Sequence, residues 1–206
     1  MKEEEIQDEL VSIRRLMERS SKFISLSGLS GILAGIYALI GAGIAYFLMY
    51  RGPVIVYKSL SLGTYPPTLI YLMLVAVGVL ALSIISGVVL TLRKASKNGQ
   101  PVWGKVSKVL FFNMATPLVT GGILILIFID RGYYGVVGPS SLIFYGLSLI
   151  SASNFTFTDV KYLGLCEIVL GLIAACFPGY GLLFWAIGFG VLHIVYGSLM
   201  YFKYDR

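Results

Sequence analysis

Residues 68–92 read TLIYLMLVAVGVLALSIISGVVLTL. This stretch of 25 residues contains no charged side chain. At about 1.5 Å per residue, a helix of this length exceeds the hydrocarbon core of a bilayer, which is roughly 30 Å thick. Because backbone polar groups in lipid must be bonded within the segment, the stretch predicts a transmembrane α-helix.

Five further apolar blocks of similar length accompany this one. Of the 206 residues, 57% are hydrophobic and 13% are charged, against roughly 25% charged in soluble domains. We predict an all-α fold, in which a cytoplasmic amphipathic helix (residues 1–22) precedes a polytopic six-transmembrane-helix bundle (residues 23–206). The predicted spans are residues 23–50, 68–92, 106–129, 139–157, 160–177 and 182–202.

Lysine and arginine are unevenly distributed around these blocks. With the N-terminus inside, 13 of the 16 fall on cytoplasmic segments and three on outer loops. Cytoplasmic loops are enriched in lysine and arginine, so this bias predicts a multi-pass protein of the cell membrane with both termini in the cytoplasm. The net charge of +6 is thereby explained by membrane orientation, and no nucleic-acid partner is expected.

Residues 2–22 show a helical hydrophobic period outside the lipid. Ile6, Leu10, Ile13 and Met17 recur at spacings of four, three and four. One interpretation is a short helix lying on the bundle or at the lipid surface. The alternative is a coiled-coil seam that pairs two protomers or binds a partner protein, although the stretch holds fewer than three clean heptads.

Small residues predict close helix packing in the first span. Ser27, Gly31 and Gly35 are spaced by four and form one face. Such faces let helix backbones approach closely in lipid. Pro117 cannot donate a hydrogen bond to the carbonyl of residue 113, so a kink is expected in the third span.

Three strongly polar side chains lie deep in the predicted spans: Asn113, Glu167 and His193. Counted from the inner ends, Asn113 and Glu167 are about 10 Å deep and His193 about 13 Å deep. Polar groups in lipid usually face the bundle interior and find a partner. We therefore expect a polar pocket in the cytoplasmic half, formed by Asn113, Glu167 and His193 with Ser30 at comparable depth.

This pocket has three interpretations. Glu167 and His193 could satisfy each other and fix helix packing, they could form a proton- or ligand-binding site, or they could never meet. A metal site is not expected, because zinc needs three or four ligands and the chain has a single histidine. No cofactor is expected, and Cys166 and Cys176 are interpreted as packing residues on different helix faces.

Three function classes remain open. The first choice is a structural, accessory or regulatory membrane protein. The alternative is a small transporter or ligand-binding membrane protein that uses Glu167, His193 and Asn113. A third class is a membrane-embedded enzyme acting on a lipid-like substrate, with Glu167 and His193 as acid and base.

Overall fold

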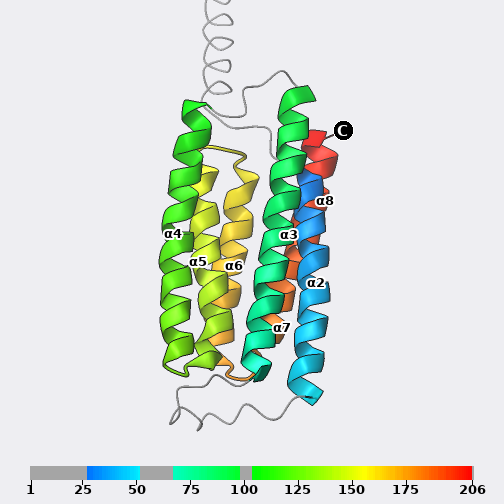
Figure 1. Cartoon of the computed structure of the whole chain (residues 1–206). Coiled ribbons are helices and arrows are strands. Elements are labelled where there is room, and N and C mark those ends of the chain that lie inside the picture. Colours follow the sequence, from blue (N-terminus) through cyan, green and yellow to red (C-terminus); the bar gives the residue numbers. More distant parts are fainter. Residues whose placement is uncertain (1–26, 52–66, 98–103, 206) are drawn as a thin grey trace, which may run out of the picture.

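The computed structural model describes residues 27–51, 67–97 and 104–205, so the predicted helix at residues 1–22 lies outside the described part. The described residues are helical apart from short turns, and no strand occurs among them. The long helices stand side by side in one bundle (Figure 1). They are α2 (Gly28–Arg51), α3 (Pro67–Lys97), α4 (Lys105–Asp130), α5 (Val137–Ser153), α6 (Asp159–Cys176) and a last helix (Gly181–Asp205).

Two of these helices include non-α turns. A short 3-10 turn, η1 (Tyr134–Val136), leads into α5. The last helix consists of α7 (Gly181–Trp185), the π-helical segment η2 (Ala186–Leu192), α8 (His193–Met200) and the π-helical segment η3 (Tyr201–Asp205). π-Helical turns are rare and are frequently found at functional sites, so the residues around η2 are candidates for such a site.

Five of the described helices are long and apolar enough to cross a membrane, judged by length and composition. They are α2, α3, α4, α5 with η1, and the last helix. The remaining helix, α6, is 18 residues long but carries three charged residues, Asp159, Lys161 and Glu167. Its predicted counterpart, residues 160–177, therefore differs from the other blocks in its charge.

Glycine contacts hold the helices together in two pairs. In the first pair, α5 and α6 approach so closely that a Cβ on Gly146 would lie 2.5 Å from the carbonyl oxygen of Gly164. In the second pair, α2 packs against η2 and α8, and a Cβ on Gly35 would lie 2.6 Å from the carbonyl oxygen of Gly190. A side chain larger than hydrogen at Gly146 or Gly35 would push the helices of that pair apart.

The helices α3 and α4 pack on the outside of these pairs, α3 against α2 and α4 against α5 (Figure 1). Both remain largely exposed, and almost none of the apolar length of either helix is buried. Their exposed surfaces are apolar, as expected for helices surrounded by lipid.

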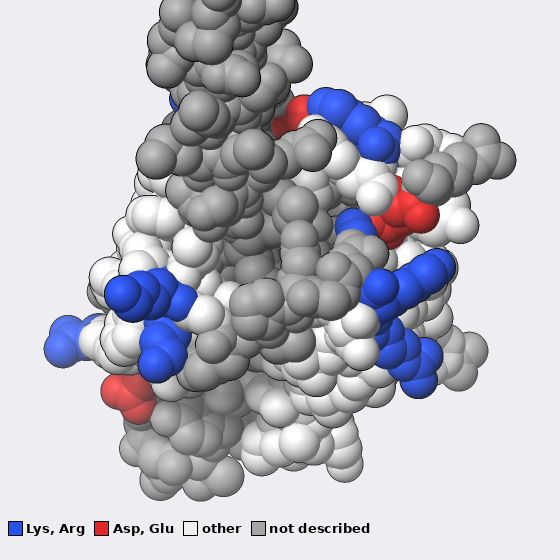
Figure 2. Space-filling model, turned by 90° about the horizontal axis from the view of Figure 1, so that it is seen from above, with Lys and Arg blue, Asp and Glu red and all other residues white. Residues whose placement is uncertain are grey.

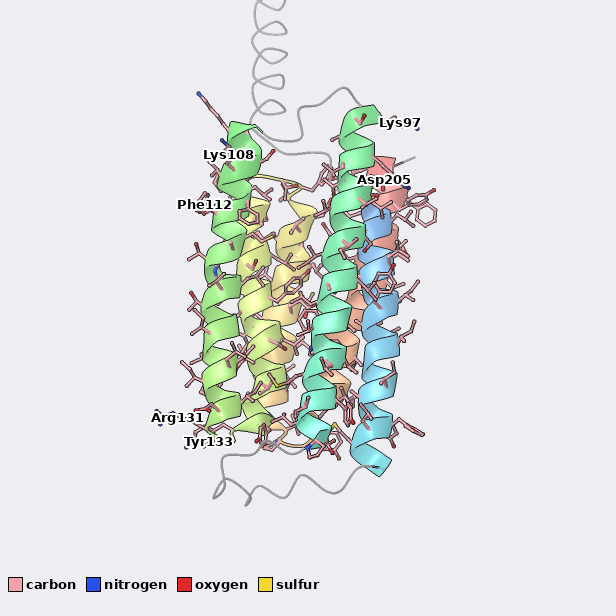
Figure 3. The ribbon with its side chains drawn as sticks, viewed as in Figure 1. Lys97, Lys108, Phe112, Arg131, Tyr133 and Asp205 are labelled. Atoms are coloured by element: carbon pink, nitrogen blue, oxygen red, sulfur yellow. The ribbon has the colours of Figure 1, made fainter. Side chains whose placement is uncertain are left out.

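The two ends of the bundle differ in charge. Lys97, Lys108 and Asp205 lie at one end, while Arg131 and Tyr133 lie at the other (Figure 3). Seen from above, the first end carries several groups of lysine and arginine around its edge (Figure 2). We call this the lysine-rich end; α2, α4 and α6 begin there, and α3 and the last helix end there.

Candidate functional site

Glu167 lies on α6 with no solvent-exposed surface. Neither of its carboxylate oxygens has a hydrogen-bond partner within the described part of the chain. A buried carboxylate that lacks hydrogen bonds is costly when charged, so this side chain is the least satisfied group in the bundle core.

His193 of α8 lies beside this carboxylate. Its Nδ1 is 3.4 Å from Oε1 of Glu167 and 3.0 Å from the carbonyl oxygen of Gly188. A carbonyl can only accept a hydrogen bond, so Nδ1 carries the proton and donates it to Gly188. Nε2 lies 2.7 Å from the hydroxyl oxygen of Tyr145 and, when the ring is neutral, accepts its hydrogen bond. Both ring nitrogens are therefore engaged.

Tyr145 of α5 joins this cluster, although it was not among the site residues predicted from the sequence. Its ring lies 5.3 Å from the His193 ring and 5.0 Å from Phe189, and Phe189 in turn lies 5.1 Å from Trp185. The available signal was position, because residue 145 is far from both ends of the predicted span 139–157 and so belongs to neither aromatic belt. Tyr145, Glu167 and His193 are hereafter the polar cluster.

The π-helical segment η2 shapes the space around Glu167. A Cβ on Gly188 would lie 2.5 Å from Oε2 of Glu167 and 2.5 Å from Cδ2 of Leu142. A side chain at this position would therefore require Glu167 and Leu142 to shift where the last helix passes the carboxyl group. The same residue supplies the carbonyl that orients His193, which links the π-helical backbone directly to the polar cluster.

The structure does not bring Asn113 to this cluster, contrary to the expected pocket. Its amide nitrogen donates to the carbonyl of Val109, one turn earlier on α4, at 2.8 Å. The helix α4 packs against α5 through a neighbouring face, about 100° around the helix from Asn113, where the carbonyl of Met114 accepts a hydrogen bond from Ser148. The depth of a residue along a helix does not specify which way its side chain faces.

Ser30 also lies away from the polar cluster. Its hydroxyl donates to the carbonyl of Ser27 in the first turn of α2, at 2.6 Å. The small residues of the predicted packing face have different neighbours: Gly31 and Gly35 contact the last helix, while Ser27 bonds to Asp205. Pro117 lies inside α4, which continues without a break from Lys105 to Asp130.

A second polar group occupies the lysine-rich end. The carboxylate of Asp205 accepts hydrogen bonds from the hydroxyl of Ser27 and the N–H of Gly28, and it pairs with Lys94 of α3. Nearby, Asp159 accepts hydrogen bonds from Lys203 and from the hydroxyl of Tyr204, each at 2.7 Å. The hydrogen bond from Lys203 lowers the pKa of Asp159 below its usual value.

The arrangement suits proton exchange better than metal binding. No group of three or more His, Cys, Asp or Glu side chains that could hold a metal ion occurs in the ranges that the structure describes. The polar cluster instead places one carboxyl group beside one imidazole, and both can gain or lose a proton. No protein-family model, curated protein or solved structure matches the chain.

Proposed function

We propose that this chain is an accessory or regulatory protein of the cell membrane that binds a proton at Glu167. It crosses the bilayer six times, with both termini in the cytoplasm, and α6 is the span that carries the proton-binding side chain. The lysine-rich end of the bundle supports this orientation, because lysine and arginine gather on cytoplasmic segments.

The observation that carries the proposal is the unbonded carboxyl group of Glu167. A charged carboxylate without hydrogen bonds costs several kcal/mol in a low-dielectric interior, on the order of the whole stability of a small domain. A neutral carboxylic acid avoids most of this cost. The packing described above therefore corresponds to the proton-bound form, in which His193 remains neutral between Tyr145 and Gly188.

The position of the polar cluster links this proton to the arrangement of helices. Tyr145 and Glu167 belong to the glycine-packed pair of α5 and α6, whereas His193 and Gly188 belong to the helix that packs on α2. Loss of the proton places a negative charge at the contact between the two pairs. The pairs then separate or admit water, and this change is the regulatory signal.

Trp185 provides a direct test, because its ring lies 5.1 Å from that of Phe189, beside the polar cluster. In a Trp103→Phe background, Trp185 is the sole tryptophan. We expect its fluorescence to change in a single step as the pH of purified protein in nanodiscs is raised. Glu167→Gln, which mimics the neutral acid, removes the step, and the control Asp159→Asn retains it.

Two results contradict proton binding at Glu167. One is a parent protein whose fluorescence shows no step between about pH 4 and 9, a range that covers ordinary carboxyl and histidine values. The other is an unchanged step in Glu167→Gln, which would assign the titration to another group. Infrared spectroscopy adds a second measurement, since the carbonyl band of a protonated carboxylic acid should be present in the parent and absent in Glu167→Gln.

Labelling tests the proposed topology separately. In a background with Cys166→Ala and Cys176→Ala, cysteine is introduced at Lys97 or at Tyr133, which lie at opposite ends of the bundle (Figure 3). A membrane-impermeant thiol reagent added to intact cells should label Tyr133→Cys and leave Lys97→Cys unlabelled. Labelling of both from the same side contradicts the six-span arrangement.

A small proton-coupled transporter is the second candidate, and η2 is the feature that favours it. Transporters often bind their substrates where a helix departs from α-geometry near the middle of the membrane. The π-helical segment passes the carboxyl group of Glu167 at Gly188. Loss of substrate uptake into proteoliposomes in the Glu167→Gln variant would select the transporter. Loss of the cellular phenotype on deletion of residues 2–20, with no effect of Glu167→Gln, selects an accessory role independent of the proton.

A further inference from the structure

One exposed side of α4 carries an uninterrupted heptad pattern. Its residues are spaced by four, three, four, three and four, and we call them the α4 seam: Val109, Asn113, Thr116, Thr120, Ile123 and Ile127. Val109, Ile123 and Ile127 are between 42% and 55% exposed, the two threonines are also exposed, and Asn113 is half-buried. Spacings that alternate between four and three repeat every seven residues, which is the pattern by which two helices wrap around each other with a left-handed twist.

The α4 seam does not face the rest of the bundle. Gly121 packs against Phe144 of α5, and this contact marks the inward side of α4. At about 100° per residue, Thr120 lies about 100° and Asn113 about 80° around the helix from Gly121, both in the same direction. The neighbouring Phe112 points to the outer side of α4 (Figure 3). Among the residues that the structure describes, none therefore prevents a helix of another molecule from packing on the seam.

Asn113 is the polar residue of this seam that needs a partner. Thr116 and Thr120 donate their hydroxyls to carbonyls one turn earlier on α4, at 2.9 and 2.8 Å. The amide nitrogen of Asn113 makes one such bond, to Val109. Its second N–H and its carbonyl oxygen have no hydrogen bond to any residue that the structure describes. Polar groups left unbonded in lipid cost several kcal/mol, so the amide favours a second helix.

We propose that the α4 seam binds the α4 seam of a second copy of this chain. Two copies inserted in the same direction are related by a two-fold axis along the membrane normal, so their α4 helices run parallel. Asn113 then meets Asn113 at the same depth. A primary amide both donates and accepts, so two such groups complete each other's hydrogen bonds without any other partner. A single asparagine in a heptad seam also defines register and the number of strands.

The other features of the seam fit this partner. Thr116 and Thr120 follow Asn113 along α4, away from the lysine-rich end. Both are small, so they allow the two helices to approach closely there. Ile123 and Ile127 continue the contact toward the far end of α4 with apolar side chains. Lys105 and Lys108 lie in the first turn of α4, at the lysine-rich end, where water and salt weaken their repulsion across the two-fold axis.

Disulfide scanning in native membranes tests the contact. Single cysteines replace Thr116, Thr120 or Ile123 on the seam, and Leu118 or Gly122 on the opposite flank, in a background with Cys166→Ala and Cys176→Ala. Mild oxidation should cross-link two copies at the seam positions and leave the controls monomeric. Monomers at every position, equal cross-linking on both flanks, or cross-links to a different protein would each overturn the proposal.

The role of Asn113 is tested by substitution without cysteine. Fluorescence energy transfer between labelled copies is measured in liposomes over a range of protein-to-lipid ratios. Asn113→Leu should weaken self-association about tenfold, the effect expected of an amide pair between membrane helices. Asn113→Gln should retain it. An unchanged association in Asn113→Leu contradicts the proposal, and Glu167→Gln separates it from proton binding, because that variant should still form the dimer.

Discussion

The hydroxyl of Ser27 donates a hydrogen bond of 2.9 Å to the carboxylate of Asp205, although 178 residues separate the two in sequence. The same carboxylate accepts from the N–H of Gly28, at 2.8 Å. The first N–H groups of a helix have no partner within the helix, and an acidic side chain near them is stabilising. Asp205 therefore caps α2 from the end of a different helix.

Removal of this cap should destabilise the bundle. We expect Asp205→Ala to lower the free energy of unfolding by about 1–2 kcal/mol, because the α2 N-terminus loses an acceptor and Lys94 loses its ion pair. Thermal unfolding in detergent measures the effect. In a double-mutant cycle, Ser27→Ala and Asp205→Ala should be non-additive, whereas the distant pair Ser141→Ala and Asp205→Ala should be additive. Additivity in both cycles would contradict the assigned contact.

Gly188→Ala should disturb the polar cluster. The added methyl group would overlap with Oε2 of Glu167 and with Leu142, so both side chains must shift. We expect a loss of about 1–3 kcal/mol in unfolding free energy, as for other overpacked cores, together with altered Trp185 fluorescence. The matched control is Gly122→Ala, since a Cβ at Gly122 meets no atom within 4 Å. Equal stability of the two variants would show that the space beside Glu167 is not restricted.

Gly146→Ala should separate α5 from α6. A Cβ at this position would lie 2.5 Å from the backbone carbonyl of Gly164, which cannot rotate away as a side chain can. We expect a loss of at least about 1–3 kcal/mol, measured by thermal unfolding. Gly78→Ala on α3 serves as the control, because a Cβ there has no neighbour within 4 Å. A tolerated Gly146→Ala would disprove the close approach of these helices.

The contribution of Asp159 should depend on pH. The hydrogen bond from Lys203 lowers the pKa of Asp159 in the folded protein, so the folded state favours the charged form. This stabilisation is present above the usual carboxyl pKa and is lost as the pH falls through the lowered value. The difference in melting temperature between the parent and Asp159→Asn should therefore shrink below about pH 4. A difference that is constant with pH would assign the effect of the substitution to packing.

The lengths and order of the helices were the part of the fold most readily predicted. Residues 68–92 lie within α3, and residues 106–129 lie within α4. Block length determines both, because each block must hold its backbone hydrogen bonds across the same apolar thickness. The π-helical segment η2 was not predicted, since an apolar segment such as Ala186–Leu192 has the same composition whether its hydrogen bonds span four residues or five.

The polar cluster was accessible to sequence analysis only in part. A contact between Glu167 and His193 was predicted from their similar depth and from the short turn between their helices. In the structure, Nδ1 of His193 lies 3.4 Å from Oε1 of Glu167. Asn113 was grouped with them by depth alone, yet it faces away because α4 packs on α5 through Met114 and Gly121. Asp205 was overlooked because nothing in the local sequence indicates that a residue so distant would cap α2.

The composition of α6 has a consequence for the biogenesis of the protein. With Asp159, Lys161 and Glu167 among its 18 residues, this helix gains less from transfer into lipid than its neighbours do. A translocon that transfers segments into lipid one at a time would transfer α6 poorly. In the six-span arrangement proposed above, the hairpin of α5 and α6 would enter the bilayer as a unit, with Gly146 packed on Gly164. Insertion of α6 would then depend on the contact between these two glycines.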